Sequence, residues 1–163
     1  MAVLSDRDIL ARMKDHSIVD PFEEANLTPN GIDLRINEIM FDGEVQPEGK
    51  FTLHPGKWML VSTTEVIDMP GDLVGNLWLR SSWVRKGMLT SFGVVDSGFN
   101  GTLTMSGFNA GLNPIEISTG DRYVQMIMIE LAGEVEKAYA ERSGSYQGQR
   151  GITTPLGDSG STM

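Results

Sequence analysis

Apolar and polar residues alternate with a period of two in several parts of the chain, which is the pattern of a β-strand with one buried face. The clearest alternating positions are Ile32, Leu34, Ile36, Leu73, Leu77 and Leu79. Further apolar runs cover 58–61, 94–95, 103–105 and 123–131, and turn signals separate them at 55–56, 70–72, 100–101, 113–114 and 120–121. Short strands with regular breaks predict an all-β sandwich or barrel.

The first residues follow a helical pattern instead. Ser5 and Asp8 resemble a capping box, in which two side chains satisfy backbone N–H groups at the start of a helix. An apolar face at helical spacing is made of Leu4, Ile9, Leu10 and Met13. Asp20-Pro21 then ends the stretch, because the residue before a proline avoids the helical conformation. We therefore expect one short N-terminal helix before the strands.

The composition describes one domain without cysteine chemistry. The 163 residues are 40% apolar and 21% charged, which suits a single domain with its own core. There are no cysteines, so disulfides, thiolate nucleophiles and the cysteine-bound zinc of the zinc deaminases are excluded. With two histidines, His16 and His54, we expect no zinc site. A cysteine-free chain also suits the reducing cytoplasm, where we expect it.

Charge and hydropathy argue against two classes of partner. The formal net charge is −9, whereas a nucleic-acid surface needs clustered Lys and Arg. A small anionic substrate is still compatible with this charge where a few arginines converge. There is no run of about 18 apolar residues and no basic-then-apolar leader, so we expect neither a membrane span nor a signal peptide.

Two segments carry groups that suit a phosphorylated ligand. Arg80 and Arg85 flank Ser81 and Ser82, and guanidinium groups beside hydroxyls bind phosphate oxygens. Alone, such a string is more typical of a strand end. Gln125 follows the turn at 120–121 and lies among apolar residues, where its amide either pairs with the backbone or reaches a ligand.

A third segment places an acid beside a glycine-rich turn. Asp96 follows the apolar pair 94–95, and the turn after it carries Phe99. Taken alone, this pattern favours an Asp that caps the turn of a hairpin. The chain shows no Walker loop, no Rossmann glycine pattern and no Ser-His-Asp arrangement.

In their order along the chain, these segments resemble the trimeric dUTPase and dCTP deaminase superfamily. The similar stretches are 4–9, 20–22, 28–34, 79–85, 93–101, 120–125 and 146–151, so the resemblance covers nearly the whole chain. Its specificity lies in the ordered set rather than in any one motif. It implies a distorted β-barrel of dUTPase-like type with a short N-terminal helix, assembled as a homotrimer.

Ser106 decides between the two branches in this interpretation. In the deaminase branch, a Glu on the strand after the glycine-rich turn shuttles protons while water attacks the cytosine, and Ser106 stands at that position here. A serine cannot act as a proton shuttle near neutral pH without a separate base. Val94-Val95-Asp96-Ser97 and Gly120-Asp121-Arg122 also resemble the dUTPase branch. The sequence therefore favours a dUTP diphosphatase that forms dUMP and pyrophosphate.

The resemblance also implies a role for each site residue. Asp96 would orient and deprotonate the attacking water, Phe99 would lie against the deoxyribose, and Asp33 would support the site. The triphosphate would carry the magnesium ion, with no direct protein ligand. The neighbouring subunit would contribute the phosphate-binding residues Arg80, Ser81, Ser82, Arg85 and Gln125. The uracil would be read near Thr90 and by the strand 102–106, which includes Ser106.

The C-terminal segment is rich in Gly, Ser and Thr, and two interpretations stay open. We expect a β-barrel domain over 1–142 and a flexible lid over 143–163, in which Tyr146, Gln149 and Arg150 contact the nucleotide. The alternative is a frayed terminus.

Two other functions also stay open. One is a dCTP deaminase, including the bifunctional kind that forms dUMP, favoured by the N-terminal helix, the Arg-Ser-Ser-x-x-Arg spacing and the tail. The other is a catalytically weak nucleotide-binding regulatory protein.

Overall fold

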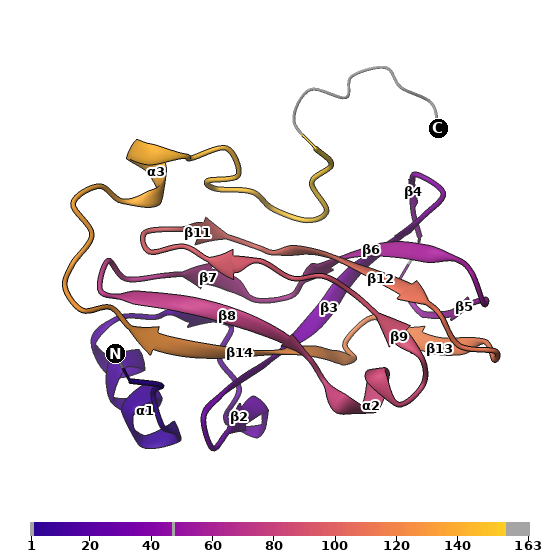
Figure 1. The fold of residues 1–163 in the computed structure, drawn as a ribbon, viewed down its shortest axis with the longest axis horizontal. Coiled ribbons are helices and arrows are strands. Elements are labelled where there is room, and N and C mark those ends of the chain that lie inside the picture. Colours follow the sequence, from indigo (N-terminus) through magenta and orange to yellow (C-terminus); the bar gives the residue numbers. More distant parts are fainter. Residues whose placement is uncertain (1, 47, 156–163) are drawn as a thin grey trace.

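A computed structural model describes residues 2–46 and 48–155 (Figure 1). Its helices are α1 (Asp6–Asp15), the 3-10 turn η1 (Glu24–Asn26), α2 (Ser81–Val84) and α3 (Tyr139–Arg142). The strands of the first half are β1 (Val19–Asp20), β2 (Leu27–Thr28), β3 (Gly31–Phe41), β4 (Glu44–Val45), β5 (Lys50–Leu53), β6 (Trp58–Thr63), β7 (Val66–Asp68) and β8 (Leu73–Leu79). The later strands are β9 (Met88–Leu89), β10 (Val94–Val95), β11 (Asn100–Gly101), β12 (Thr104–Asn109), β13 (Ile115–Ser118) and β14 (Arg122–Glu130).

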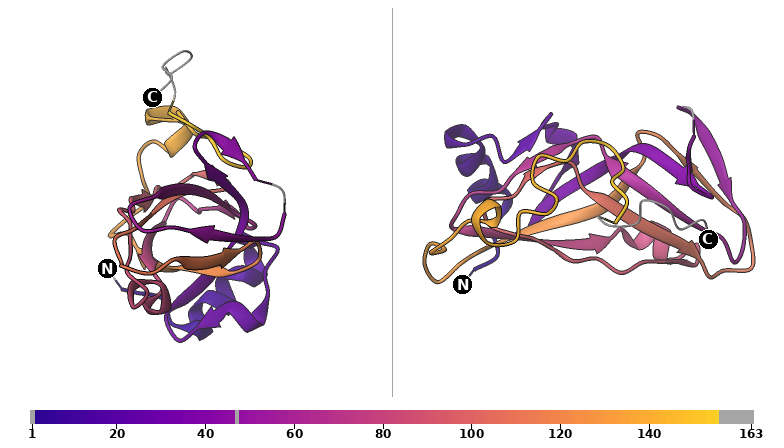
Figure 2. Two further views of the ribbon diagram at one scale, coloured as in Figure 1. Left: turned by 90° about the vertical axis from the view of Figure 1, so that its right-hand side faces the viewer. Right: turned by 90° about the horizontal axis from the view of Figure 1, so that it is seen from above.

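The main sheet of the described residues runs in the order β10-β8-β14-β3-β6-β12-β9. Two smaller sheets, β1-β7-β11 and β13-β5, extend it. Seen end on, the strands curl around a shared interior (Figure 2). This arrangement confirms the predicted all-β distorted barrel (Figure 2). The core fills the interior with side chains that are almost wholly buried, among them Ile32, Leu34, Ile36, Met59, Val61, Tyr123 and Met126.

The N-terminal helix forms as the sequence predicts. Ser5 Oγ accepts a hydrogen bond from the Asp8 N–H at 3.3 Å, and Asp8 Oδ2 accepts one from the Ser5 N–H at 3.2 Å, which completes the capping box. Ile9 of the helix and Leu4 just before it are both buried. The helix ends at Asp15, before the Asp20-Pro21 boundary that the sequence suggested.

One predicted turn lies elsewhere. Asn100-Gly101 was expected to reverse the chain, but the pair forms β11 and pairs with Asp68 and Ile67 of β7. The reversal occurs earlier, where the Phe99 N–H donates to the Asp96 carbonyl at 3.1 Å and Gly98 adopts a φ of 80°. Gly98 suits this conformation because it has no Cβ. The turn therefore sits directly against Asp96.

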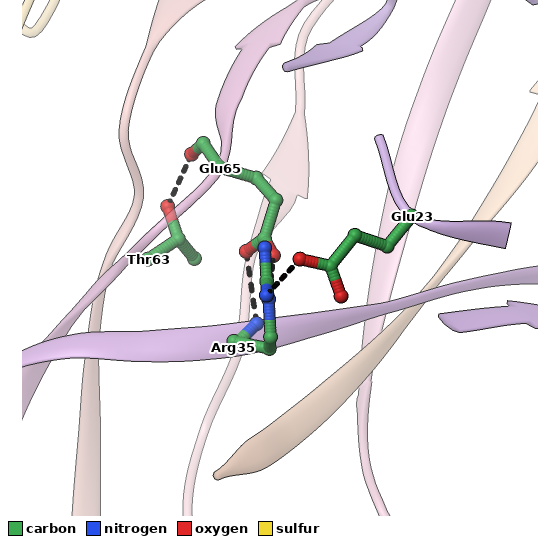
Figure 3. A network of polar contacts seen from close by, with 4 residues as sticks. All are labelled: Glu23, Arg35, Thr63 and Glu65. Atoms are coloured by element: carbon green, nitrogen blue, oxygen red, sulfur yellow. Dashed lines mark hydrogen bonds and ion pairs between the residues drawn. The ribbon is translucent and has the colours of Figure 1, made fainter. Parts of the chain in front are cut away.

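An ion-pair network that is buried at Glu65 and exposed at Glu23 joins β3 to the turn between β6 and β7 (Figure 3). The Arg35 N–H and its guanidinium Nε both donate to the Glu65 carboxylate, at 2.9 and 2.7 Å, and a second guanidinium nitrogen pairs with Glu23. Thr63 Oγ1 donates to the Glu65 carbonyl and accepts a hydrogen bond from the Leu103 N–H. Because each buried polar group has a partner, the network holds Leu103 at the start of β12 without an unpaired charge.

Candidate active site

A cavity of about 390 Å³ lies between β12, β8 and the C-terminal segment, a volume in the range of small-molecule sites. Its polar and aromatic lining comes from Asp96, Phe99, Thr104, Tyr139, Tyr146, Gln149 and Thr153. Its apolar lining includes Leu60, Leu77, Val95 and Leu103. The structure thus brings together four predicted site residues that are up to 53 positions apart in the sequence: Asp96, Phe99, Tyr146 and Gln149.

Asp96 lies exposed at this cavity. Within residues 2–46 and 48–155, no hydrogen bond or ion pair involves its carboxylate, and its turn is closed through its backbone carbonyl. A capping Asp would use its side chain for that purpose. The carboxylate is therefore available to a ligand or a water molecule.

Phe99 is buried beside Asp96 and packs edge-on against Tyr139, with ring centroids 5.5 Å apart and an interplanar angle of 76°. The Tyr139 hydroxyl also accepts a hydrogen bond from the Tyr146 N–H at 3.2 Å. Tyr139 therefore links the aromatic wall of the cavity to the C-terminal segment. Tyr139 was not among the residues predicted from the sequence, although its place just before a Gly- and Ser-rich segment was the signal that could have found it.

The C-terminal segment runs along β11 and β12 of its own chain, as Figure 1 shows in yellow. The Gly148 N–H donates to the Asn100 carbonyl at 2.7 Å, and the Gln149 carbonyl accepts from the Thr102 N–H at 3.0 Å. Arg150 contacts the Asn100 side chain at 3.4 Å and lies at the exposed rim. The lid role of this segment stays a prediction, and residues 156–163 of the predicted lid lie outside the described residues.

A second cavity of about 280 Å³ lies further along β12. Ser106 lines it and pairs across the sheet with Leu60, which lines the first cavity. The Ser106 carbonyl accepts hydrogen bonds from Thr90 Oγ1 at 2.7 Å and from the Tyr123 hydroxyl at 2.8 Å. Burial raises the pKa of Tyr123 well above its ordinary value, so its hydroxyl stays a donor. The structure thus brings Thr90 and Ser106 together, and their role at the base stays a prediction.

The predicted phosphate-binding residues form a separate group near α2. Arg80 Nε lies 2.9 Å from Asp33 Oδ2, and an Arg122 guanidinium nitrogen lies 3.4 Å from the same oxygen. Burial raises the pKa of Asp33, while the charges of Arg80 and Arg122 act in the opposite direction. Gln125 pairs with Asp33 across the sheet and donates to Thr28 Oγ1. The first turn of α2 holds Ser81 and Ser82, exposed beside Arg85.

The two groups lie at opposite ends of β8. Val95 pairs with Gly75 in an antiparallel register, so Asp96 lies beside Val74, whereas Arg80 follows the far end of the strand. Six residues at roughly 3.3 Å each place Arg80 about 20 Å from Asp96. Within one chain, the group around Asp96 and the group around Arg80 therefore lie too far apart to contact one another.

An exposed apolar surface surrounds the second cavity. Its residues are Trp58, Trp78, Val84, Leu89, Val94 and Phe108, each 42–61% exposed. Leu89 lines both the second cavity and a neighbouring groove that Trp78, Val84 and Val94 also line. A contiguous apolar surface of this kind is typical of a protein–protein interface.

A family model described as dCTP deaminase-like matches residues 37–131, more than half of the chain. The dCTP deaminase of Pyrococcus horikoshii is 36% identical over 84% of this chain and 88% of its own length. This chain belongs to the dCTP deaminase-like family. A dUMP-forming dCTP deaminase of Streptomyces coelicolor is 35% identical over 93% of each chain.

Solved structures show the same fold for this member of the dCTP deaminase-like family. The 2'-deoxycytidine 5'-triphosphate deaminase of Agrobacterium tumefaciens has a TM-score of 0.67 at 17% identity, over 77% of this chain and 47% of the other. This chain thus spans about half the length of that protein. The dUTPase of Staphylococcus aureus phage phi11 has a TM-score of 0.51 at 18% identity, over 77% of this chain and 97% of the other. These likenesses show the fold, and together with the family model and the relatives they agree with the superfamily of dUTPases and dCTP deaminases.

The comparisons overturn the prediction of a dUTP diphosphatase. That prediction depended mainly on Ser106, which replaces an expected Glu. Relatives with 35–36% identity over most of this chain are dCTP deaminases, including a dUMP-forming one. The prediction was wrong because it gave one position more weight than similarity along the whole chain.

Within the described residues, no helix is long and apolar enough to cross a membrane.

Proposed function

We propose that the protein deaminates dCTP at C4 of the cytosine. The observation that carries this proposal is the similarity to dCTP deaminases over 84–93% of the chain. The cavity beside Asp96 and Phe99 supports it, because its volume and mixed lining suit a nucleoside. Water adds at C4 and ammonia leaves, so the site must take a proton from the water and return one to the leaving amine.

Asp96 is the residue to which we assign this proton transfer. Among the described residues that line the first cavity, Asp96 is the one carboxylate, and β12 carries no acid. Its carboxylate is free of other partners in the described part of the chain. A positioned carboxylate contributes a rate factor of about 10²–10⁴ as a general acid–base. Phe99 would then border the deoxyribose, and Ser106 and Thr90 line the separate second cavity.

The triphosphate would bind to the group near α2 of a neighbouring copy. Arg80, Ser81, Ser82, Arg85 and Gln125 offer guanidinium, hydroxyl and amide donors, which suit phosphate oxygens. Asp33 orients the Arg80 guanidinium through its Nε, and Nη1 contacts the Arg122 carbonyl at 3.4 Å, so that within the described residues Nη2 is left to face a ligand. Tyr146, Gln149 and Arg150 of the C-terminal segment would complete the contacts.

A homotrimer is the assembly that we propose. A site that needs both Arg80 and Asp96 is incomplete in one chain, because the two residues lie at opposite ends of β8. The exposed apolar surface around Trp78 and Leu89 would be buried against the next copy. A cyclic arrangement then forms an equivalent site between each pair of subunits.

Magnesium would reach the site on the triphosphate. Among the described residues there is no cluster of three His, Asp or Glu side chains that could hold an ion. Mg²⁺ usually keeps several waters and binds through substrate phosphates, so it needs no dedicated cage of protein ligands. When bound, the ion would neutralise phosphate charge.

Conversion to dUMP is a second candidate activity. The Streptomyces coelicolor relative that covers 93% of this chain is a dUMP-forming dCTP deaminase. Hydrolysis would need a second water that attacks the α-phosphorus and displaces pyrophosphate. The balanced reaction takes two waters and releases ammonia, dUMP and pyrophosphate.

The test is an incubation with dCTP and Mg²⁺ that measures ammonia and separates the nucleotides by ion exchange. We expect one ammonia for each dCTP consumed. Accumulation of dUTP would indicate deamination alone, whereas dUMP with an equal amount of pyrophosphate would indicate the coupled reaction. No ammonia above a protein-free control, at protein concentrations that bind dCTP, would overturn the proposed function.

A further inference from the structure

Glu38 lies outside the nucleotide cavity but contacts the segment that closes it. Glu38 belongs to β3, and its Oε2 accepts a hydrogen bond from the Ile152 N–H at 2.8 Å. The two residues are 114 positions apart in the sequence. Gln149 and Thr153, on either side of this contact, both line the first cavity. Glu38 thus holds the chain between two residues of the cavity wall.

Ser62 fixes the position of the Glu38 carboxylate. Ser62 is fully buried on β6, and its Oγ donates to Glu38 Oε2 and accepts from the Glu38 N–H, both at 3.2 Å. A side chain held at both ends by one hydroxyl has few alternative rotamers. The carboxylate is therefore preorganised to receive the Ile152 N–H, and a charged acceptor makes a stronger hydrogen bond than a neutral one.

Gly151 packs directly on the same carboxylate. A Cβ at Gly151 would lie 2.5 Å from Glu38 Oε2, which no real Cβ contact allows. The residue also has a φ of 67°, which favours glycine. The next contact along the segment is the Thr153 N–H, which donates to Thr104 Oγ1 at 2.9 Å. The Glu38 carboxylate, Gly151 and the Ile152 N–H therefore form one closely packed contact.

We propose that Glu38 is a positioning residue that anchors the C-terminal segment on its own subunit and thereby places Gln149 and Tyr146 at the nucleotide. The kinetic part of this inference rests on the proposed function, whereas the anchoring itself does not. Glu38 does not touch the substrate. It acts by reducing the conformational freedom that the segment would lose when a nucleotide binds.

The first experiment compares Glu38→Ala with Glu44→Ala, an exposed acid on β4, by amide exchange without nucleotide. We expect exchange of the Ile152 and Thr153 amides to be at least tenfold faster in Glu38→Ala, with exchange in β3 and β6 unchanged. Glu38→Gln should restore part of the protection because its amide oxygen still accepts a hydrogen bond. Equal exchange in Glu38→Ala and the control would overturn the proposal.

The second experiment uses the glycines. Gly151→Ala and Gly148→Ala place a side chain at a similar positive φ, 67° and 75°, but a Cβ at Gly148 has no neighbour within 4 Å. We expect Gly151→Ala to loosen the segment as Glu38→Ala does, and Gly148→Ala to have a smaller effect. In the double variant of Glu38 and Gly151, amide exchange of the segment should be no faster than in either single variant. Additive effects on exchange would show that the two residues act separately and would overturn the proposal that they form one contact.

The third experiment measures kinetics with dCTP. Glu38→Ala should raise KM about tenfold while kcat changes less than twofold. The reason is that the unanchored segment loses more conformational entropy when it becomes ordered on the nucleotide. In a chain truncated after Gly144, the same substitution should change kcat/KM by less than twofold. An equal loss in the truncated chain would mean that Glu38 acts on the barrel and not on the segment. Absence of ammonia from the wild type would refute the proposed function but leave the exchange result intact.

Discussion

Arg80 and Asp96 lie at opposite ends of β8, about 20 Å apart along the strand. Both belong to the proposed site, so in the proposed homotrimer Arg80 would come from one subunit and Asp96 from another. The alternative, in which one chain folds back to join them, would require β8 to bend within a sheet that β14 and β10 hold on both sides.

Mixing two inactive variants tests this shared site. Arg80→Ala and Asp96→Asn, unfolded together and reassembled, should recover about one quarter of the wild-type activity, because random assembly completes that fraction of the sites between subunits. Ammonia release from dCTP is the measurement, with each variant reassembled alone as the control. No recovery in a mixture that sediments as a trimer would contradict a site shared between subunits.

Replacing the Asp96 carboxylate should abolish catalysis while binding persists. Asp96→Asn should lower kcat by about two to four orders of magnitude, the scale of a lost general acid–base. Because the carboxylate has no partner among the described residues, the melting temperature should stay within a few degrees of the wild type. Asp15→Asn, an exposed residue at the end of α1, is the matched control. Activity within a few-fold of the wild type would reduce Asp96 to a turn residue.

Asp33 should make stability depend on pH. Burial raises the pKa of Asp33 above its ordinary 3.8. Between that value and the raised one, the native state binds more protons than the unfolded state, so the free energy of unfolding falls as pH rises and then becomes constant. Asp33→Asn removes this slope. Urea denaturation between pH 3.5 and 7 should show the variant gaining stability relative to the wild type as pH rises through this window. A difference in the free energy of unfolding between variant and wild type that does not vary with pH would refute the raised pKa of Asp33.

Truncation after Gly144 should separate folding from turnover. The removed residues pack on the outside of β11 and β12, so the barrel core and the exposed apolar surface stay intact. We expect the same sedimentation and nearly the same melting temperature, with turnover reduced at least tenfold. The truncation should weaken triphosphate binding more than monophosphate binding, which calorimetry can measure. Full activity of the truncated chain would indicate a frayed terminus.

Tyr123 and Thr90 should support the Ser106 carbonyl together. Tyr123→Phe removes one of its two hydrogen bonds, at a cost of about 1 kcal/mol because Thr90 still satisfies the acceptor. Thr90→Val removes the other at a similar cost. The double variant leaves the carbonyl without either donor, so its loss in urea denaturation should exceed the sum of the two single losses. Simple additivity would show that the two hydroxyls act independently.

Several features of this protein follow from local sequence alone. The capping box of Ser5 and Asp8 spans four residues, so its geometry depends on a single helical turn. The alternation at Ile32, Leu34 and Ile36 predicts a strand because side chains on a strand point to opposite faces with a period of two. The family resemblance added the barrel and the candidate residues, and comparison with known proteins confirmed the superfamily. The choice between its branches failed because it depended on Ser106 alone.

Only the tertiary structure decided how distant residues meet. The position of the turn before β11 depends on pairing with β7, which no local pattern at Asn100-Gly101 reveals. The partner of Arg80 is Asp33, and the partner of Ile152 is Glu38, 114 residues away. Such pairs are set by sheet register and by the requirement that buried polar groups find partners, and both are properties of the whole fold. The periodicity of a strand specifies its faces, whereas its neighbours depend on which faces can be buried together.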